Sequence, residues 1–268
     1  MNYIQSLTTP EQNTHLANYI LEIKIEQMKE QQLDIATKDG SMKTFITVPE
    51  EGGPYPVVLF LMDAPGKREE LHDMARRIAT VGYYVMLPNL YYRTAREFER
   101  DDTAESTDKM REHMAALTNA MVVQDCRTML DFSDQDSDAK AGPAGCTGYC
   151  MSGPFAFAAA AQIPDRIKAS ASIHGVSLCT DADDSPHLDA DKIQGEMYFG
   201  CAETDVHVPT EMIEQLEAHM KTTNINYRIE WYPSTVHGYV FPLRGKAYHK
   251  ACAERHWERL FALFKRNF

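Results

Sequence analysis

Residues 145–154 read Gly145-Cys146-Thr147-Gly148-Tyr149-Cys150-Met151-Ser152-Gly153-Pro154. In this stretch an apolar strand ends, a cysteine follows, and a helix rich in small residues begins. That order matches the nucleophile elbow, which reads G-x-S-x-G in its serine form. Gly148 provides the small residue before Cys150, whereas Ser152 takes the place of the second glycine. Because the amides at a helix N-terminus favour a thiolate, Cys150 is the candidate nucleophile. The alternative is a small buried side chain.

On both sides of this stretch, apolar runs typical of buried strands alternate with segments of helical periodicity. This alternation predicts an α/β fold, with a mostly parallel central sheet and helices on both faces. A single domain is expected over residues 33–268, preceded by an N-terminal helical extension over residues 1–32. Strands are expected at 33–37, 42–48, 56–62, 84–90, 144–149, 169–174, 196–199 and 226–232, and helices at 69–81, 120–132, 152–162, 210–221 and 246–265. The first two strands flank an Asp-Gly turn and predict a hairpin.

Two further candidate residues follow later strands. Asp205 lies in the loop after the strand at 196–199, and His237 lies in the loop after the strand at 226–232. Ligands and catalytic groups of such sheets gather at the carboxyl ends of the strands. After an elbow nucleophile, the chain order acid and then histidine completes a catalytic triad. His174 also ends a strand, where it could approach the site or serve as a structural histidine.

Composition excludes several classes of partner. The formal net charge of −12 argues against binding to nucleic acid or to an anionic membrane. Six irregularly spaced cysteines, without a secretory signal before them, indicate reduced thiols and a cytoplasmic protein. No histidine and carboxylate spacing indicates a metal, and no phosphate-binding motif indicates a nucleotide, so no cofactor is expected.

At these residues the chain resembles the dienelactone hydrolase family, also called carboxymethylenebutenolidases. The resemblance covers residues from about 33 to 268 and rests on four segments. These are Gly148-Tyr149-Cys150-Met151-Ser152-Gly153, the aspartate segment 200–209, His237-Gly238-Tyr239, and Leu90-Tyr91-Tyr92-Arg93. The resemblance implies an α/β-hydrolase fold and the hydrolysis of an ester or lactone, with Cys150 as nucleophile, His237 as general base and Asp205 as its orienting acid.

The resemblance also implies roles for residues around the triad. Backbone N–H groups of Met151 and Ala64 would form the oxyanion hole. Asp63 stands where the family has a glutamate that holds the resting thiol, and Arg93 matches an arginine that binds a substrate carboxylate. A second such arginine is replaced by Phe241, and Arg244 is the residue that could substitute for it.

The expected reaction is hydrolysis of a small ester or lactone through an acyl-thioester on Cys150. Two alternatives remain open from the sequence. One is a broad carboxylesterase or thioesterase with an apolar pocket. The other is a non-catalytic redox-sensing protein that uses Cys150 as a peroxide-reactive thiol.

Overall fold

The centre of the protein is built on strands that are apolar on both faces. The computed structural model describes residues 28–268, in which β3 (Tyr55–Leu61) and β4 (Tyr84–Pro88) are buried along nearly their whole length. Such uninterrupted apolar runs suit parallel strands that are covered on both sides. The other strands are β1 (Lys29–Thr37), β2 (Gly40–Val48), β5 (Ala139–Tyr149), β6 (Ile167–Ile173), β7 (Glu196–Thr204) and β8 (Asn226–Val236).

These strands form one sheet in the order β1-β2-β4-β3-β5-β6-β7-β8. The hairpin of β1 and β2 is antiparallel, and β2 pairs antiparallel with β4. From β4 to β8 every neighbouring pair is parallel. The predicted mostly parallel sheet is therefore confirmed, and the carboxyl ends of β3 and of β5 to β8 meet along one edge.

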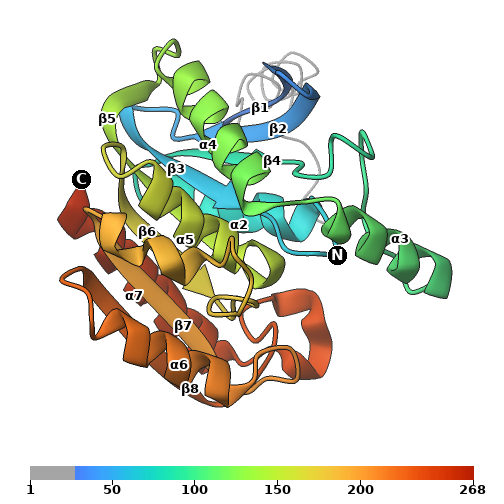
Figure 1. Ribbon diagram of the computed structural model, residues 1–268. Coiled ribbons are helices and arrows are strands. Elements are labelled where there is room, and N and C mark those ends of the chain that lie inside the picture. The colour runs from blue at the N-terminus through green and yellow to red at the C-terminus, as the bar shows by residue number, and fades with distance from the viewer. Residues whose placement is uncertain (1–27) are drawn as a thin grey trace, which may run out of the picture.

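Helices cover both faces of this sheet (Figure 1). On one face lie α4 (Asn119–Ser133) and α5 (Gly153–Gln162), and on the other lies α7 (Lys250–Asn267). α7 neighbours α2 (Glu69–Ala79) through an Arg77–Glu254 ion pair and the packing of Arg77 over Trp257. The other helices are α3 (Ala104–Ala115) and α6 (Thr210–Met220). Three short 3₁₀ helices are η1 (Cys150–Ser152), η2 (Pro186–Lys192) and η3 (Pro242–Ala247). None of the helices within residues 28–268 is long and apolar enough to cross a membrane.

The structure differs from the sequence prediction mainly at the ends of elements. The predicted helical extension over residues 1–32 lies mostly outside the described residues, but its last part, residues 29–32, belongs to strand β1. β5 begins at Ala139 rather than Ala144, because Ala139 pairs with Tyr55 before a register shift in the ladder. The strand after residue 195 continues to Thr204, beside β8.

Candidate active site

Cys150 occupies a sharp turn between β5 and α5. Tyr149 is extended, with φ −116° and ψ 140°, whereas Cys150 has φ 53°, in the left-handed region. A non-glycine residue there stores about 1–3 kcal/mol of strain, which is found mostly at functional sites. A Cβ at Gly148 would lie 2.0 Å from the Ser152 carbonyl oxygen. The turn therefore requires glycine at position 148, as the elbow motif predicts.

Ser152 explains the imperfect match to the motif. Its side chain is fully buried, and its hydroxyl donates a hydrogen bond to the Met62 carbonyl at the end of β3. The position that requires glycine after the nucleophile is 153 rather than 152, because a Cβ at Gly153 would lie 2.4 Å from the Gly175 Cα. Serine at position 152 therefore ties the turn to the neighbouring central strand.

Asp205 and His237 are brought together by the register of two neighbouring strands. Thr204 of β7 pairs with Val236 of β8, so the residue that follows each strand lies beside the other. His237 Nδ1 donates to Asp205 Oδ2 at 2.7 Å. The second carboxylate oxygen, Oδ1, accepts from the His207 backbone N–H at 2.9 Å. Asp205 thus binds the Nδ1 edge of the His237 ring, and Nε2 lies at the opposite edge.

His237 has a raised proton affinity. Burial lowers its pKa, but the hydrogen bond to Asp205 and the interaction with the Cys150 thiol outweigh this and raise the pKa to about 9. Nε2 is buried and has no hydrogen-bond partner among the described residues. Cys150 is half-buried. An imidazole oriented in this way, beside a thiol, can accept the thiol proton and stabilise the resulting thiolate.

The two segments expected to form an oxyanion hole are linked by Tyr91, which sequence reasoning did not assign. The Tyr91 hydroxyl donates to the Ala64 carbonyl at 2.8 Å and lies 3.2 Å from the Met151 sulfur. Ala64 follows β3 and Met151 follows the nucleophile, and both are buried. The signals in the sequence were the position of Tyr91 just after a central strand and its place in the segment Leu90-Tyr91-Tyr92-Arg93.

Asp63 is paired with arginines rather than with the thiol. Its fully buried carboxylate accepts from Arg68 Nη1 at 2.5 Å and from Arg244 Nη2 at 2.7 Å, with no bond to Cys150. The structure therefore shows no hydrogen bond between Asp63 and Cys150 of the kind expected of a resting-thiol partner. Arg68, which the sequence analysis missed, also bonds Glu70 at 2.6 Å.

Arg244 lies close to this cluster and is partly open to solvent. Its side chain is 32% exposed, and its guanidinium lies 5.2 Å from the Phe241 ring. Arg68 lies over the same ring, at 5.4 Å. Phe241 is thus a buried platform beneath two guanidinium groups, and of these Arg244 keeps donors that Asp63 does not occupy.

Arg93 is engaged elsewhere. Its Nη1 and Nη2 each donate to the buried Asp125 carboxylate at 2.8 Å, and its Nε donates to Asp39 at 2.9 Å. Only 12% of the side chain is exposed. These bonds occupy the planar fork that a substrate carboxylate would need.

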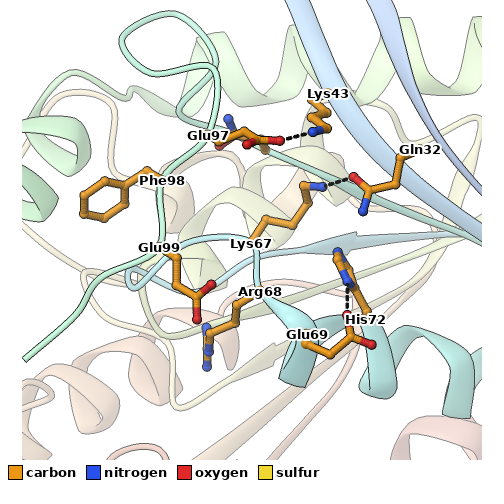
Figure 2. A pocket seen from close by; sticks show the side chains of 10 residues that line it. Gln32, Lys43, Lys67, Arg68, Glu69, His72, Glu97, Phe98 and Glu99 are labelled. Carbon is orange, nitrogen blue, oxygen red and sulfur yellow. Dashed lines mark hydrogen bonds and ion pairs between the residues drawn. The ribbon is translucent and has the colours of Figure 1, made fainter.

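A polar cavity of about 430 Å³ is lined by Arg68 together with Lys67, Lys43 and Glu99 (Figure 2). The Lys67 ammonium donates to Gln32 there at 2.8 Å. Burial and the neighbouring Lys43 lower the pKa of Lys67 to about 8. Cys150, His237 and Asp205 do not line this cavity.

Comparison with known proteins gives a consistent result. Residues 42–268 match the model of the family described as "Dienelactone hydrolase family". A Synechocystis protein named "Putative carboxymethylenebutenolidase" is 26% identical over 224 residues, which cover 82% of this chain and 90% of that protein.

Among solved structures, the "Putative Dienelactone Hydrolase" of Klebsiella pneumoniae superposes with a TM-score of 0.80 at 22% identity, over 90% of this chain and 99% of that one. A "Dienelactone Hydrolase-like Promiscuous Phospotriesterase P91" from metagenomic libraries superposes with a TM-score of 0.75 at 18% identity, over 90% and 99% of the two chains. At these identities the structural likeness shows the α/β-hydrolase fold alone.

Proposed function

Because the chain belongs to the dienelactone hydrolase family, and is therefore a hydrolase of ester or lactone bonds, we propose that Cys150 is its nucleophile. His237 serves as the general base and Asp205 orients it. The observation that carries the proposal is the 2.7 Å bond between His237 Nδ1 and Asp205, which leaves the buried Nε2 without a partner among the described residues, in a ring that interacts with the Cys150 thiol.

The proposed reaction has two halves. In the first, His237 Nε2 takes the proton of the thiol, and the Cys150 sulfur attacks the carbonyl carbon of the substrate. The N–H groups of Ala64 and Met151 stabilise the oxyanion. The C–O bond to the leaving group then breaks, the leaving alkoxide takes the proton from His237, and an acyl-thioester remains on Cys150.

The second half releases the acid. His237 removes a proton from a water molecule, whose oxygen attacks the thioester carbonyl. The C–S bond breaks, and the proton on His237 returns to the Cys150 sulfur. The products are a carboxylic acid and the free thiol. When the substrate is a lactone, both products of cleavage belong to one hydroxy acid.

The arrangement of the arginines supports a substrate that carries a carboxylate in addition to its ester or lactone group. We propose that Arg244, rather than Arg93, binds this group, because Arg244 is partly exposed and bonds Asp63 through Nη2 alone. A charge-assisted hydrogen bond of this kind contributes about 1.5–3 kcal/mol.

The nucleophile is tested with p-nitrophenyl acetate and with a carboxylate-bearing unsaturated lactone. Cys150→Ala should abolish turnover of both, and mass spectrometry of the wild-type protein at short times should show one acyl group on Cys150. Cys179→Ala is the matched control, because Cys179 is also a half-buried free thiol. Full turnover in Cys150→Ala would assign the reaction to another group.

A further inference from the structure

His174 is held at the meeting point of the three proposed triad loops. It follows β6, and its backbone N–H donates to the Gly200 carbonyl of β7 at 2.7 Å. Two residues later, the Val176 N–H donates to the Cys150 carbonyl at 3.2 Å. His174 itself has φ 39°. A strained backbone pinned on two sides places its side chain with little freedom.

The ring of His174 packs directly on the ring of His237. The two centroids lie 4.7 Å apart, with the planes inclined at 63°. The exposed His207 makes a similar contact with His237, at 4.8 Å and 76°. His237 is therefore in contact with two imidazole rings, of which that of His174 is buried and that of His207 is exposed.

His174 is poorly explained as a packing residue alone. It is 1% exposed, and neither ring nitrogen has a hydrogen-bond partner among the described residues. An unsatisfied buried polar group costs about 1–3 kcal/mol, which a phenylalanine would avoid. The Tyr239 hydroxyl is also buried without a partner in residues 28–268, and its ring lies 5.9 Å from that of His174. One internal water shared by the two would satisfy a donor or acceptor on each.

We propose that His174 is a positioning residue for His237. Together with a water held by the Tyr239 hydroxyl, its ring keeps His237 Nε2 directed at Cys150 through both proton transfers. The inference rests on the proposed triad and adds to it a residue that does not touch substrate.

The surrounding charges favour an uncharged His174. Burial lowers its pKa well below the usual value, and His237, His256 and Arg244 lower it further. The ionisable groups that raise the pKa of His237 are Asp205 and Cys150. The other ionisable side chains in contact with its ring are those of His174 and His207. Because His174 carries no charge, it can support the imidazolium form of His237 without repelling it.

The test compares His174→Phe with His207→Ala, which removes a ring at nearly the same distance from His237 but on the solvent side. In wild-type protein, NMR titration of labelled histidines should place the His237 pKa near 9. His174→Phe should lower this pKa by about one unit or more, because a misdirected ring loses part of its interaction with Asp205 and Cys150. His207→Ala should leave it unchanged.

The same variants are assayed for reactivity. In His174→Phe, the rate of alkylation of Cys150 by iodoacetamide at pH 6 should fall about tenfold, which corresponds to one pKa unit. The kcat for p-nitrophenyl acetate should also fall about tenfold, with KM unchanged. Tyr239→Phe, which removes a single oxygen, should give part of the same loss. The double variant should be no worse than His174→Phe, because the two residues share one water.

An unchanged His237 pKa and unchanged kcat in His174→Phe would overturn the inference, as would multiplicative losses in the double variant. If His174→Phe does not fold, a wild-type His237 pKa and wild-type kcat in Tyr239→Phe would overturn it. Titration and alkylation need no ester. A wild-type protein that fails to hydrolyse esters therefore refutes the proposed function, while the dependence of His237 on His174 is still decided by these two measurements.

Discussion

A single hydroxyl group connects the two segments that supply the proposed oxyanion hole. Tyr91 is 1% exposed, and its hydroxyl reaches both the Ala64 carbonyl and the Met151 sulfur. Burial is the main cause that raises the pKa of Tyr91 above its usual range, so the group stays protonated and can donate. The distance between the two backbone N–H groups therefore depends on a residue that contacts neither the thiol nor the base through a hydrogen bond.

Tyr91→Phe should lower kcat for p-nitrophenyl acetate by about tenfold, with KM nearly unchanged, because a misplaced oxyanion donor affects mainly the transition state. Steady-state kinetics measures both constants. Tyr92→Phe is the control, since the Tyr92 hydroxyl bonds Asp125 and Thr37 instead. Equal losses in the two variants would indicate general damage to this loop rather than an effect on the oxyanion hole.

The position of a residue just after a strand could be predicted from the sequence, but its charged partners could not. Asp205 and His237 meet as expected because their strands are neighbours in the sheet. Arg93 pairs with Asp125, which lies on α4 and is 32 positions away, and no periodicity indicates that contact. Asp63 was expected to hold the resting thiol, and its carboxylate accepts a bond from Arg244, 181 positions away.

At the scale of elements, the elbow between β5 and α5 depends on close approach of two backbone segments. Gly148→Ala should destabilise the fold by about 3 kcal/mol or more, since the added Cβ would meet the Ser152 backbone and cannot be moved aside cheaply. Gly145→Ala on the same strand is the comparison, because the atoms nearest its Cβ, at 2.9 Å, belong to the side-chain rings of Phe264 and Phe268 rather than to backbone. Urea unfolding of both variants checks the order, and a smaller loss for Gly148→Ala would contradict it.

Arg93 joins three elements: the turn of the first hairpin, the loop after β4, and α4. Asp125 is almost fully buried, and burial is the main cause that raises its pKa. Arg93→Met should therefore cost about 3–5 kcal/mol of stability, as expected when one partner of a buried pair is removed. Arg96→Met breaks an exposed pair with Asp34 and should cost less than about 1 kcal/mol.

The same Arg93→Met variant separates structural support from substrate binding. If Arg93 acts only on the fold, KM for a carboxylate-bearing ester and for its methyl ester should change equally. A rise in KM for the carboxylate-bearing ester alone would show that Arg93 binds the substrate carboxylate, and would contradict the proposed role of Arg244.

Element types were predictable wherever hydrophobic periodicity is strong, as in β3, β4 and α2. Their ends were less so. The first part of β5 contains Gly142 and Pro143, which have low strand propensity and fall at the register shift of the ladder. Before that shift, Ala139 and Lys140 are strand residues because they pair with Tyr55 and Pro56 of β3. The extension of β8 past Pro233 likewise depends on β7. Pairing with a neighbouring strand determines where these two strands begin and end, and a local sequence pattern does not indicate that pairing.

For the whole molecule, the sequence predicted a mostly parallel sheet but not the order of its strands. β4 lies between β2 and β3, so the chain crosses over before it continues towards β5. That order places the elbow strand near the centre of the sheet, with β6 and β7 between it and β8. Asp205 and His237 therefore approach Cys150 from the later half of the sheet.

The stability of the whole protein should depend on pH through His237. Its folded pKa of about 9 lies above the ordinary value of 6.5, so its contribution is fully present below pH 6.5 and is lost as pH rises through about 9. The contribution is at most about 3 kcal/mol. The difference in unfolding free energy between wild type and His237→Gln should therefore be larger at pH 6 than at pH 10, as measured by urea unfolding. A constant difference would contradict the raised pKa.

The order of the proposed triad along the chain also sets when reactivity appears during protein synthesis. Cys150 leaves the ribosome first, and His237 follows 87 positions later. At about 5–20 residues per second, the nascent chain carries its thiol without its base for about 4–17 s. Since β8 must join the edge of the sheet before His237 reaches its place, an unfinished chain holds only an ordinary cysteine, and hydrolysis begins after the last strand has been made.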